Sequence, residues 1–186
     1  MAENKKNHKK RGVGLYMKNI LHRSVQIPFK EVGSNIVEIL EEVLRERYSG
    51  ICIKEGYVRN DNNFKLINNS AGTIVGDQVK FNTSFECLIC KPVEGMLINV
   101  VVKNVTKAGI RCELKGENSP IIAFIARDHY FNSKEFSNIK KDEEIRIKTI
   151  GVRYELNDKY ISIIGEYVIN NRPKLTIFNK LKVNRP

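Results

Sequence analysis

The sequence lacks the features that mark membrane and secreted proteins. No apolar run approaches the ~20 residues that a membrane-spanning helix needs. The lysine-rich start is followed by no hydrophobic segment, so a secretory signal is not expected. Without such a signal, the four cysteines indicate a reducing compartment rather than a disulfide framework.

Motifs for catalysis and cofactor binding are missing as well. The sequence has no glycine-rich phosphate loop and no nucleophile motif, and His8, His22 and His129 have no evident carboxylate partner in sequence. Polymerase chemistry needs clustered aspartates that hold magnesium, and no such cluster is present. The acidic run Asp142-Glu143-Glu144 is best explained as a solvated loop. We therefore expect a protein that is not an enzyme and has no cofactor.

One short motif, Cys87-x-x-Cys90, raises the question of a zinc site. Structural zinc sites need a second pair of cysteines or histidines, whereas Cys52 and Cys112 stand alone. On an extended strand, residues three apart also point to opposite faces. We therefore predict no metal site.

Positive charge is plentiful but unevenly distributed. The net charge is +11, of which residues 1–11 contribute +4 and residues 169–186 contribute +5, so the body between them carries only +2. Residues 1–11 are predicted to form a disordered basic tail and residues 169–186 a basic C-terminal extension. Two interpretations are open: the tails bind phosphates or acidic partners, or they are solvated ends that aid solubility.

Residues 12–91 are predicted to form a small α+β domain, with one main helix on an antiparallel sheet. A long strand with an irregularity is expected over Leu15–Ile27, and a helix over Asn35–Tyr48. Ser34 or Asn35 suits the N-cap, and Glu38 completes a capping box. Further strands are expected at Ile51–Val58, Phe64–Ile67, Thr73–Val75 and Val79–Cys90.

Residues 92–168 are predicted to form a five-stranded OB-fold β-barrel. The expected strands are Met96–Val105, Ile110–Leu114, Ile121–Arg127, Glu143–Val152 and Lys159–Val168, with a long connection over Asp128–Asp142. Lys91-Pro92 interrupts the strand ladder, because proline donates no N–H. Since no Gly/Ser linker separates the two halves, we expect a stiff joint there.

Several motifs together carry a family resemblance. They are Lys91-Pro92-x-x-Gly95, Val101-Val102-x-Asn104-Val105-Thr106-x-x-Gly109, Ile145-x-Ile147-x-x-x-Gly151-x-Arg153, Tyr160, Ile164-Gly165, the helix ending at Gly50, and Gly56-Tyr57-Val58. Their order and spacing over about residues 14–168 resemble the stalk subunit of multisubunit DNA-directed RNA polymerases. That family includes the seventh subunit of eukaryotic RNA polymerase II and its archaeal equivalent.

The resemblance implies an N-terminal tip domain that wedges against the polymerase body, and an OB domain that can touch emerging RNA. It also implies the large polymerase subunits and a second stalk subunit as partners. The loops expected to dock on the polymerase, at one end of the tip domain, contain Arg59, Asn60, Asp61, Gly72, Gly76 and Asp77. The candidates for contact with nascent single-stranded RNA are Lys103, Lys107, Arg111, Phe124, Arg127, Tyr130, Arg153, Tyr154 and Tyr160.

RNA binding is expected to be weak. Where related OB domains often carry aromatic residues, this chain has Ala108 and Arg111, and only Phe124 remains for stacking. Alternation places Lys103, Arg111 and Phe124 on one exposed surface if the hairpin register is as predicted, and an ordinary polar barrel surface is the competing interpretation. A free-standing OB-fold RNA-binding factor in translation or RNA processing is the alternative function.

The composition also bears on the source of the chain. It is rich in lysine, asparagine and isoleucine, which suggests an AT-rich genome, either of a large DNA virus that encodes its own polymerase or of a eukaryote. The expected location is the nucleus, or a cytoplasmic viral factory and the virion if the chain is viral.

Overall fold

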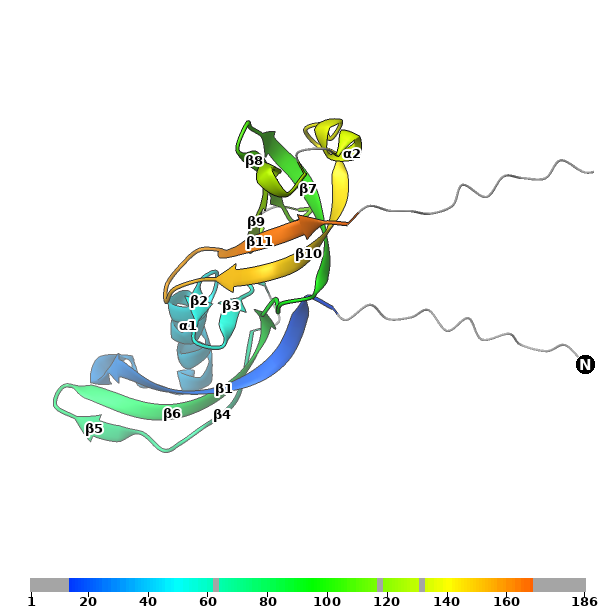
Figure 1. Ribbon diagram of the computed structural model, residues 1–186. Coiled ribbons are helices and arrows are strands. Elements are labelled where there is room, and N and C mark those ends of the chain that lie inside the picture. Colours follow the sequence, from blue (N-terminus) through cyan, green and yellow to red (C-terminus); the bar gives the residue numbers. More distant parts are fainter. Residues whose placement is uncertain (1–13, 62–63, 117–118, 131–132, 169–186) are drawn as a thin grey trace, which may run out of the picture.

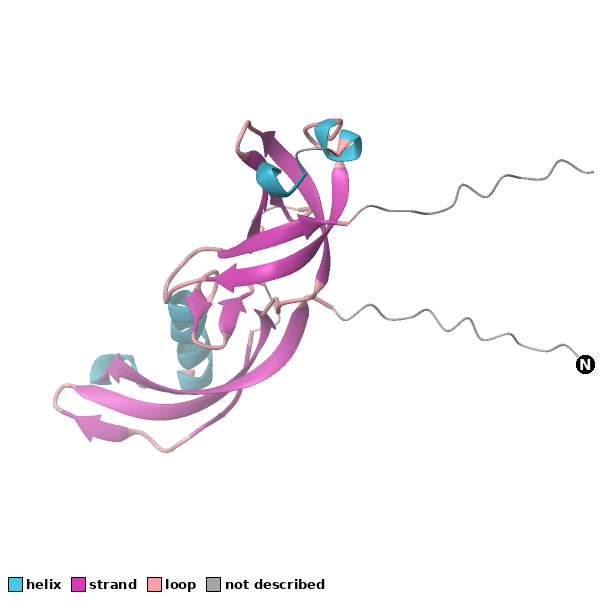
Figure 2. Ribbon diagram, viewed as in Figure 1, coloured by secondary structure: helices cyan, strands magenta, loops and turns pink. Residues whose placement is uncertain are grey.

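The computed structural model describes residues 14–61, 64–116, 119–130 and 133–168, so the predicted basic tails at 1–11 and 169–186 lie outside the described residues. A six-stranded sheet with one main helix is followed by a closed five-stranded barrel (Figure 1). Strands dominate both parts and helices are few (Figure 2). The predicted α+β class is confirmed.

Two long strands form the spine of the N-terminal sheet. Strands β1 (Tyr16–Pro28) and β6 (Gln78–Cys90) pair antiparallel along their whole length, without a register shift. The predicted irregularity in β1 is therefore wrong. The adjacent apolar residues Ile20 and Leu21 fit a regular strand, because Leu21 is buried while Ile20 faces solvent, as simple alternation requires.

Four short strands complete this sheet: β2 (Cys52–Ile53), β3 (Gly56–Val58), β4 (Lys65–Asn69) and β5 (Thr73–Val75). The order is β1-β6-β3-β2, and β4 and β5 also pair with β6. The single strand predicted at Ile51–Val58 is wrong, because the chain folds back there as the β2–β3 hairpin. Gly56 allows this fold, since a Cβ at its position would lie 2.5 Å from the carbonyl oxygen of Cys90.

The helix α1 (Ile36–Tyr48) follows a short 3-10 turn, η1 (Phe29–Glu31), and packs on one face of the sheet. Leu40 and Leu44 are fully buried, whereas Val37 is half exposed. Glu41 and Arg45 form an ion pair at 3.1 Å, and Gly50 follows the helix end with a φ of +77°. The predicted capping box does not form: Asn35 occupies the N-cap, but its side chain makes no cap hydrogen bond.

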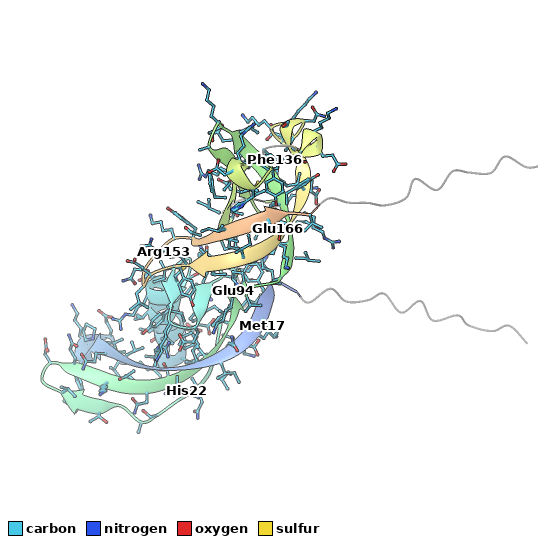
Figure 3. The ribbon with its side chains drawn as sticks, in the orientation of Figure 1. Met17, His22, Glu94, Phe136, Arg153 and Glu166 are labelled. Atoms are coloured by element: carbon cyan, nitrogen blue, oxygen red, sulfur yellow. The ribbon has the colours of Figure 1, made fainter. Side chains whose placement is uncertain are left out.

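The C-terminal strands close into a barrel in the order β10-β11-β9-β8-β7. They are β7 (Leu97–Val105), β8 (Gly109–Glu113), β9 (Ile121–Ala126), β10 (Glu144–Arg153) and β11 (Ile161–Tyr167). Strands β9 and β11 pair in parallel and the other neighbours pair antiparallel, which is consistent with the predicted OB fold. The β9–β10 connection holds η2 (Arg127–Tyr130) and α2 (Lys134–Ser137), from which Phe136 packs into the barrel core (Figure 3).

The sheet and the barrel share packing and hydrogen bonds where they meet. Cys52, Tyr57 and Cys90 of the sheet belong to the same buried cluster as the barrel interior. The β10–β11 loop lies against β2 and β3 (Figure 1). The backbone N–H of Cys52 donates to the carbonyl of Asp158 at 2.7 Å, and the N–H of Asn157 donates to the carbonyl of Cys52 at 2.9 Å. The loop is therefore held by the N-terminal half of the chain.

Candidate nucleic-acid interface

One row of outward-facing positions crosses all five strands of the barrel. Asn104 lies opposite Arg111, Arg111 opposite Phe124, Phe124 opposite Ile164, and Ile164 opposite Gly151. Phe124 is 40% exposed and Ile164 is 58% exposed, so the middle of the row is apolar and open to solvent. The register thus brings Arg111 and Phe124 together on one exposed surface.

The Phe124 ring lies over Gly109 at the start of β8. A Cβ at Gly109 would lie 2.8 Å from the ring atom Cζ and would also collide with the carbonyl oxygen of Ile125. The glycine therefore leaves room for the ring on the barrel surface. Lys103 is exposed nearby, at the irregularity between Val102 and Asn104.

A hollow of about 570 Å³ opens beside Phe124, toward the joint with the sheet. Its lining includes Phe124, Arg153, Glu155, Asp158, Tyr160 and Ile164. Figure 3 marks Arg153, which lies where β10 ends near the joint. The Tyr160 side chain is 44% exposed, so two aromatic rings are available to a ligand here. A base can stack on either ring without regard to its identity.

Two arginines of this surface are paired with carboxylates close to them in sequence. Arg111 and Glu113 are 3.2 Å apart, and so are Arg153 and Glu155. Arg111 and Glu113 are two apart on β8 and therefore face the same side, whereas Glu155 lies in the loop just beyond Arg153, the last residue of β10. Exposed pairs of this kind contribute little to stability, so they open at small cost. While these pairs are closed, the carboxylates offset the positive charge of the arginines, so the surface near Phe124 has no strong positive field.

Two of the predicted RNA-contact tyrosines make contacts within the protein. The Tyr130 ring stacks on Phe136 with centroids 4.5 Å apart, and its hydroxyl accepts from the N–H of Tyr167 at 2.6 Å. The Tyr154 hydroxyl donates to the carbonyl of Lys54 at 3.4 Å, across the joint. Burial raises the pKa of both tyrosines. The structure therefore does not place these two rings on the exposed row.

Lys107 and Arg127 lie at the turn between β7 and β8, at the end of the row. Arg127 supports this turn: its guanidinium donates to the carbonyl of Thr106 at 3.0 Å, and its backbone N–H donates to the carbonyl of Ala108 at 3.0 Å. Lys107 is exposed on the same turn. The structure thus places Arg111 and Phe124 on the row, and Phe124, Arg153 and Tyr160 in the hollow. Lys103 is exposed next to Asn104 of the row, and Lys107 and Arg127 lie at the turn beside it.

Sequence reasoning missed several residues of the hollow, among them Ile164, Glu155 and Asp158. A signal for Ile164 was present, because Ile163 and Ile164 are adjacent on one strand and only one of them can face the barrel core. Nothing in the sequence pattern singled out the carboxylates of Glu155 and Asp158. Their position depends on the β10–β11 loop, whose path is set by its contacts with Cys52.

The six predicted docking residues do not lie together. Arg59, Asn60 and Asp61 follow β3 close to the barrel, where the N–H of Arg59 donates to the carbonyl of Leu88. Gly72, Gly76 and Asp77 flank β5, which pairs with the opposite end of β6. At about 3.3 Å per residue along β6, the two groups are roughly 30 Å apart. The expectation that both loops occupy one end of the domain is wrong.

The loop after β3 is occupied by contacts at the joint. The Arg59 guanidinium lies 4.8 Å from the centre of the Tyr16 ring, and Arg59 pairs with Asp61 at 3.4 Å. Burial raises the pKa of Tyr16, so this ring stays a neutral phenol beneath the cation. These contacts tie the first residues of the predicted polar turn to the joint, although Arg59 and Asn60 remain exposed.

The far end of the N-terminal sheet carries exposed apolar side chains that the sequence did not single out. Phe29 is 59% exposed, Ile74 is 67% exposed and Val75 is 48% exposed. A hollow of about 710 Å³ opens beside these side chains, and it is lined by Pro28, Phe29, Lys30, Ile74, Gly76 and Asp77. Exposed apolar surface gathered in one place marks interaction sites. Gly76 and Asp77 are thus beside an apolar surface rather than in a purely polar loop.

The described residues contain no group of three or more His, Cys, Asp or Glu side chains that could hold a metal ion. The four cysteines are buried and free, and Cys87 and Cys90 belong to different core clusters. Burial raises the pKa of Cys112 to about 12 and that of Cys87 to about 11, so these are poor sources of thiolate. Within the described ranges, no helix is long and apolar enough to span a membrane.

Comparison with known proteins finds similarity to polymerase subunits over most of the chain, although no family model matches it. A putative DNA-directed RNA polymerase subunit of Acanthamoeba polyphaga mimivirus is 26% identical over 171 residues, covering 82% of this chain and 81% of its own. Subunit RPB7 of DNA-directed RNA polymerase II from Glycine max is 24% identical, covering 79% and 95%. Its counterpart from Dictyostelium discoideum is 21% identical, covering 78% and 96%.

A solved structure of an uncharacterised protein from Methanocaldococcus jannaschii matches 42% of this chain at 22% identity with a TM-score of 0.33, a likeness too slight to carry an argument. The resemblance to polymerase stalk subunits rests on the sequence relatives. It is confirmed at low identity over most of the chain.

Proposed function

We propose that this chain is a non-catalytic stalk subunit of a DNA-directed RNA polymerase and acts in transcription. The observation that carries the proposal is the extent of the match: the Glycine max relative covers 79% of this chain and 95% of its own length. The barrel strands span only Leu97–Tyr167, so such a match must include much of the N-terminal sheet. A free-standing OB-fold factor is not favoured, because for such a factor we would expect sequence similarity to polymerase subunits to be confined to the barrel.

Docking on the polymerase body is assigned to the N-terminal sheet. The apolar far end around Phe29, Ile74 and Val75 supports this assignment, because it is the part of the sheet where large apolar side chains are most exposed beside a hollow. Gly72, Gly76 and Asp77 belong to this end. Arg59, Asn60 and Asp61 are not part of this end, because they lie near the joint with the barrel.

RNA contact is assigned to the exposed row and the hollow of the barrel. Phe124 and Tyr160 provide stacking surfaces, and Lys103, Arg111 and Arg153 provide charge that is mostly paired. Such a surface supports weak binding that tolerates different sequences. The partners are therefore the large polymerase subunits, a second stalk subunit and nascent RNA. The place of action is the nucleus, or a viral factory and the virion if the chain is viral.

Co-purification tests the proposal. The full-length chain carrying an affinity tag is expressed in the cells that make its polymerase, and bound proteins are identified by mass spectrometry. The expected result is stoichiometric recovery of the large polymerase subunits at moderate salt. Recovery of RNA-processing or translation proteins in their place would contradict it.

A pair of variants tests the docking surface. The substitution I74D places a charge at the apolar far end, where the side chain is 67% exposed, and is expected to abolish recovery of the large subunits. The control I67D changes another exposed isoleucine, 52% exposed, on β4 and away from that end. The assignment fails if the two variants lose recovery equally or if neither does.

A further inference from the structure

The hollow beside Phe124 offers more hydrogen-bond acceptors than positive charge. The carboxylates of Glu155 and Asp158 line it, as does the hydroxyl of Ser162, and Arg153 is its one lining cation. Ionised carboxylates only accept hydrogen bonds. Because Arg153 is paired with Glu155, the hollow suits a neutral ligand that presents donors more than it suits a phosphate.

The hollow also has the size and the aromatic surface for a single nucleobase. Its volume is about 570 Å³, and the rings of Phe124 and Tyr160 are 40% and 44% exposed. Unstacked bases of single-stranded RNA are recognised on aromatic side chains while their Watson–Crick edges meet polar groups. A base that rests on one of these rings would therefore direct its edge toward the wall that carries the carboxylates.

We propose that this hollow binds a single unstacked guanine, with the carboxylate of Glu155 accepting hydrogen bonds from its N1–H and N2–H groups. Guanine presents two adjacent donors that match the two oxygens of one carboxylate. Uracil has one donor between two carbonyl oxygens, and adenine and cytosine each place a ring acceptor beside the amino group. The inference rests on the proposed RNA contact and adds a base preference to it.

Glu155 is assigned the role because Asp158 is already engaged. The Asp158 carboxylate accepts from the backbone N–H of Glu155 at 2.8 Å, and its backbone carbonyl accepts from Cys52. Asp158 thus shapes the loop. The Glu155 side chain is 73% exposed and paired only with Arg153, which is 84% exposed, so exchanging this partner for a base costs little.

The position of Glu155 is fixed before a ligand arrives. The β10–β11 loop is held against β2 by the hydrogen bonds between Cys52 and both Asn157 and Asp158. The sulfur of Cys52 also approaches the carbonyl of Tyr160 at 3.6 Å. A loop ordered in advance loses less conformational freedom when it binds a ligand. The N-terminal sheet therefore helps to build the base site on the barrel.

The test is a set of titrations of the full-length chain with labelled oligouridylates that carry guanine, inosine or uracil at one central position. The wild-type chain is expected to bind the guanine oligonucleotide about fivefold more tightly than the uracil one, at the low end for a bidentate base contact. Inosine, which lacks the N2 amino group, should fall between them.

Matched variants locate the preference. E155Q is expected to remove most of the guanine preference, measured as the ratio of the guanine and uracil affinities within the same variant, whatever the freed Arg153 does to the affinity for all three oligonucleotides. E113Q is the control, because Glu113 makes the same 3.2 Å pair with Arg111 but does not line the hollow. Absence of a guanine preference in the wild type, or its equal loss in E155Q and E113Q, would overturn the inference.

A third variant separates this inference from the proposed RNA contact. If F124A weakens binding of all three oligonucleotides and no guanine preference exists, the RNA contact stands and the guanine site is overturned. If F124A changes no affinity, the RNA contact at this surface fails together with the guanine site. Tight binding of an arginine-rich peptide that depends on Phe124, without a guanine preference, would assign the hollow to a basic protein partner instead.

Discussion

Two buried threonines differ in whether the hydroxyl finds a partner. Thr83, 2% exposed, donates to the carbonyl of Arg23 at 2.8 Å. Thr149 is 1% exposed, and its Oγ1 has no hydrogen-bond partner among the described residues. A buried polar group without a partner lowers stability, whereas the net gain from one that is paired is modest but favourable. The two positions therefore predict opposite responses to the same substitution.

Replacing each threonine by valine tests this difference. T149V is expected to raise the free energy of unfolding by about 1 kcal/mol, because an unpaired hydroxyl gives way to a methyl group. T83V is expected to lower it by about 1 kcal/mol, because a carbonyl loses its donor. Urea denaturation followed by circular dichroism measures both. A loss of stability in T149V equal to that in T83V would contradict the prediction.

An ion pair between β1 and the β2–β3 hairpin predicts a pH dependence. Arg23 donates two hydrogen bonds to Glu55, at 2.9 and 2.8 Å. Burial acts to raise the pKa of Glu55, but the hydrogen bonds and charge of Arg23 outweigh it, so the pKa lies below its usual value. The stabilisation is therefore present above the ordinary glutamate pKa of about 4.3 and is lost as the pH falls through the lower folded value.

The variant E55Q isolates this contribution. At neutral pH it should be less stable than the wild type, and the difference should shrink as the pH falls below about 4, where the wild type also loses the charge. Urea denaturation from neutral to acidic pH measures the difference. A gap that stays constant over this range would show that the pair contributes through packing alone.

At the scale of elements, long periodic segments were predictable and short ones were not. Strands β1 and β6, helix α1 and the barrel strands follow from alternation and helical spacing over many residues. The β2–β3 hairpin did not, because its turn depends on Gly56 lying against the end of β6, a contact distant in sequence. Local pattern cannot report such a contact.

The candidate site was predictable to the same extent. Arg111 and Phe124 are on strands, so their outward direction followed from alternation and register. Tyr130 and Tyr154 are outside the regular strands. Stacking on Phe136 orients Tyr130, and a hydrogen bond to the carbonyl of Lys54 orients Tyr154. The exposed apolar end at Phe29 and Ile74 was missed because only the folded chain brings η1 and β5 together.

We propose that residues 12–91 and 92–168 are two domains whose joint transmits strain between them. G56A tests this proposal. A Cβ there would lie 2.5 Å from the carbonyl oxygen of Cys90, and the φ of +139° is unfavourable for alanine, a strain of about 1–3 kcal/mol. Displacing the hairpin should loosen the β10–β11 loop that Cys52 holds.

Hydrogen exchange measures this effect. G56A should reduce amide protection in β10 and β11 of the barrel as well as in β2 and β3. G76A is the control, since a Cβ at Gly76, with a φ of +63°, meets no atom within 4 Å and lies at the far end of the sheet. If G56A leaves barrel protection unchanged, the two domains behave independently and the joint is not stiff.

At the scale of the whole molecule, charge and aromatic surface are separated. The segments 1–11 and 169–186 carry +9 of the net charge of +11, and both lie outside the described residues. The barrel surface carries Phe124 and Tyr160, and two of its arginines are paired with carboxylates. Affinity for RNA should therefore have two parts: a salt-sensitive part from the tails and a salt-insensitive part from stacking.

Deleting both tails should flatten the dependence of RNA affinity on salt, because each phosphate neutralised on a single strand contributes a slope of roughly −0.7 in log K against log salt. F124A should behave in the opposite way. It should lower affinity at every salt concentration, by about 1–3 kcal/mol for a lost stacked base, without changing the slope. Fluorescence anisotropy at several salt concentrations compares the intact, tail-deleted and F124A proteins. Tight binding by the tail-deleted protein with an unchanged slope would show that the folded body supplies the charge, and that the paired arginines on the barrel open to meet phosphates.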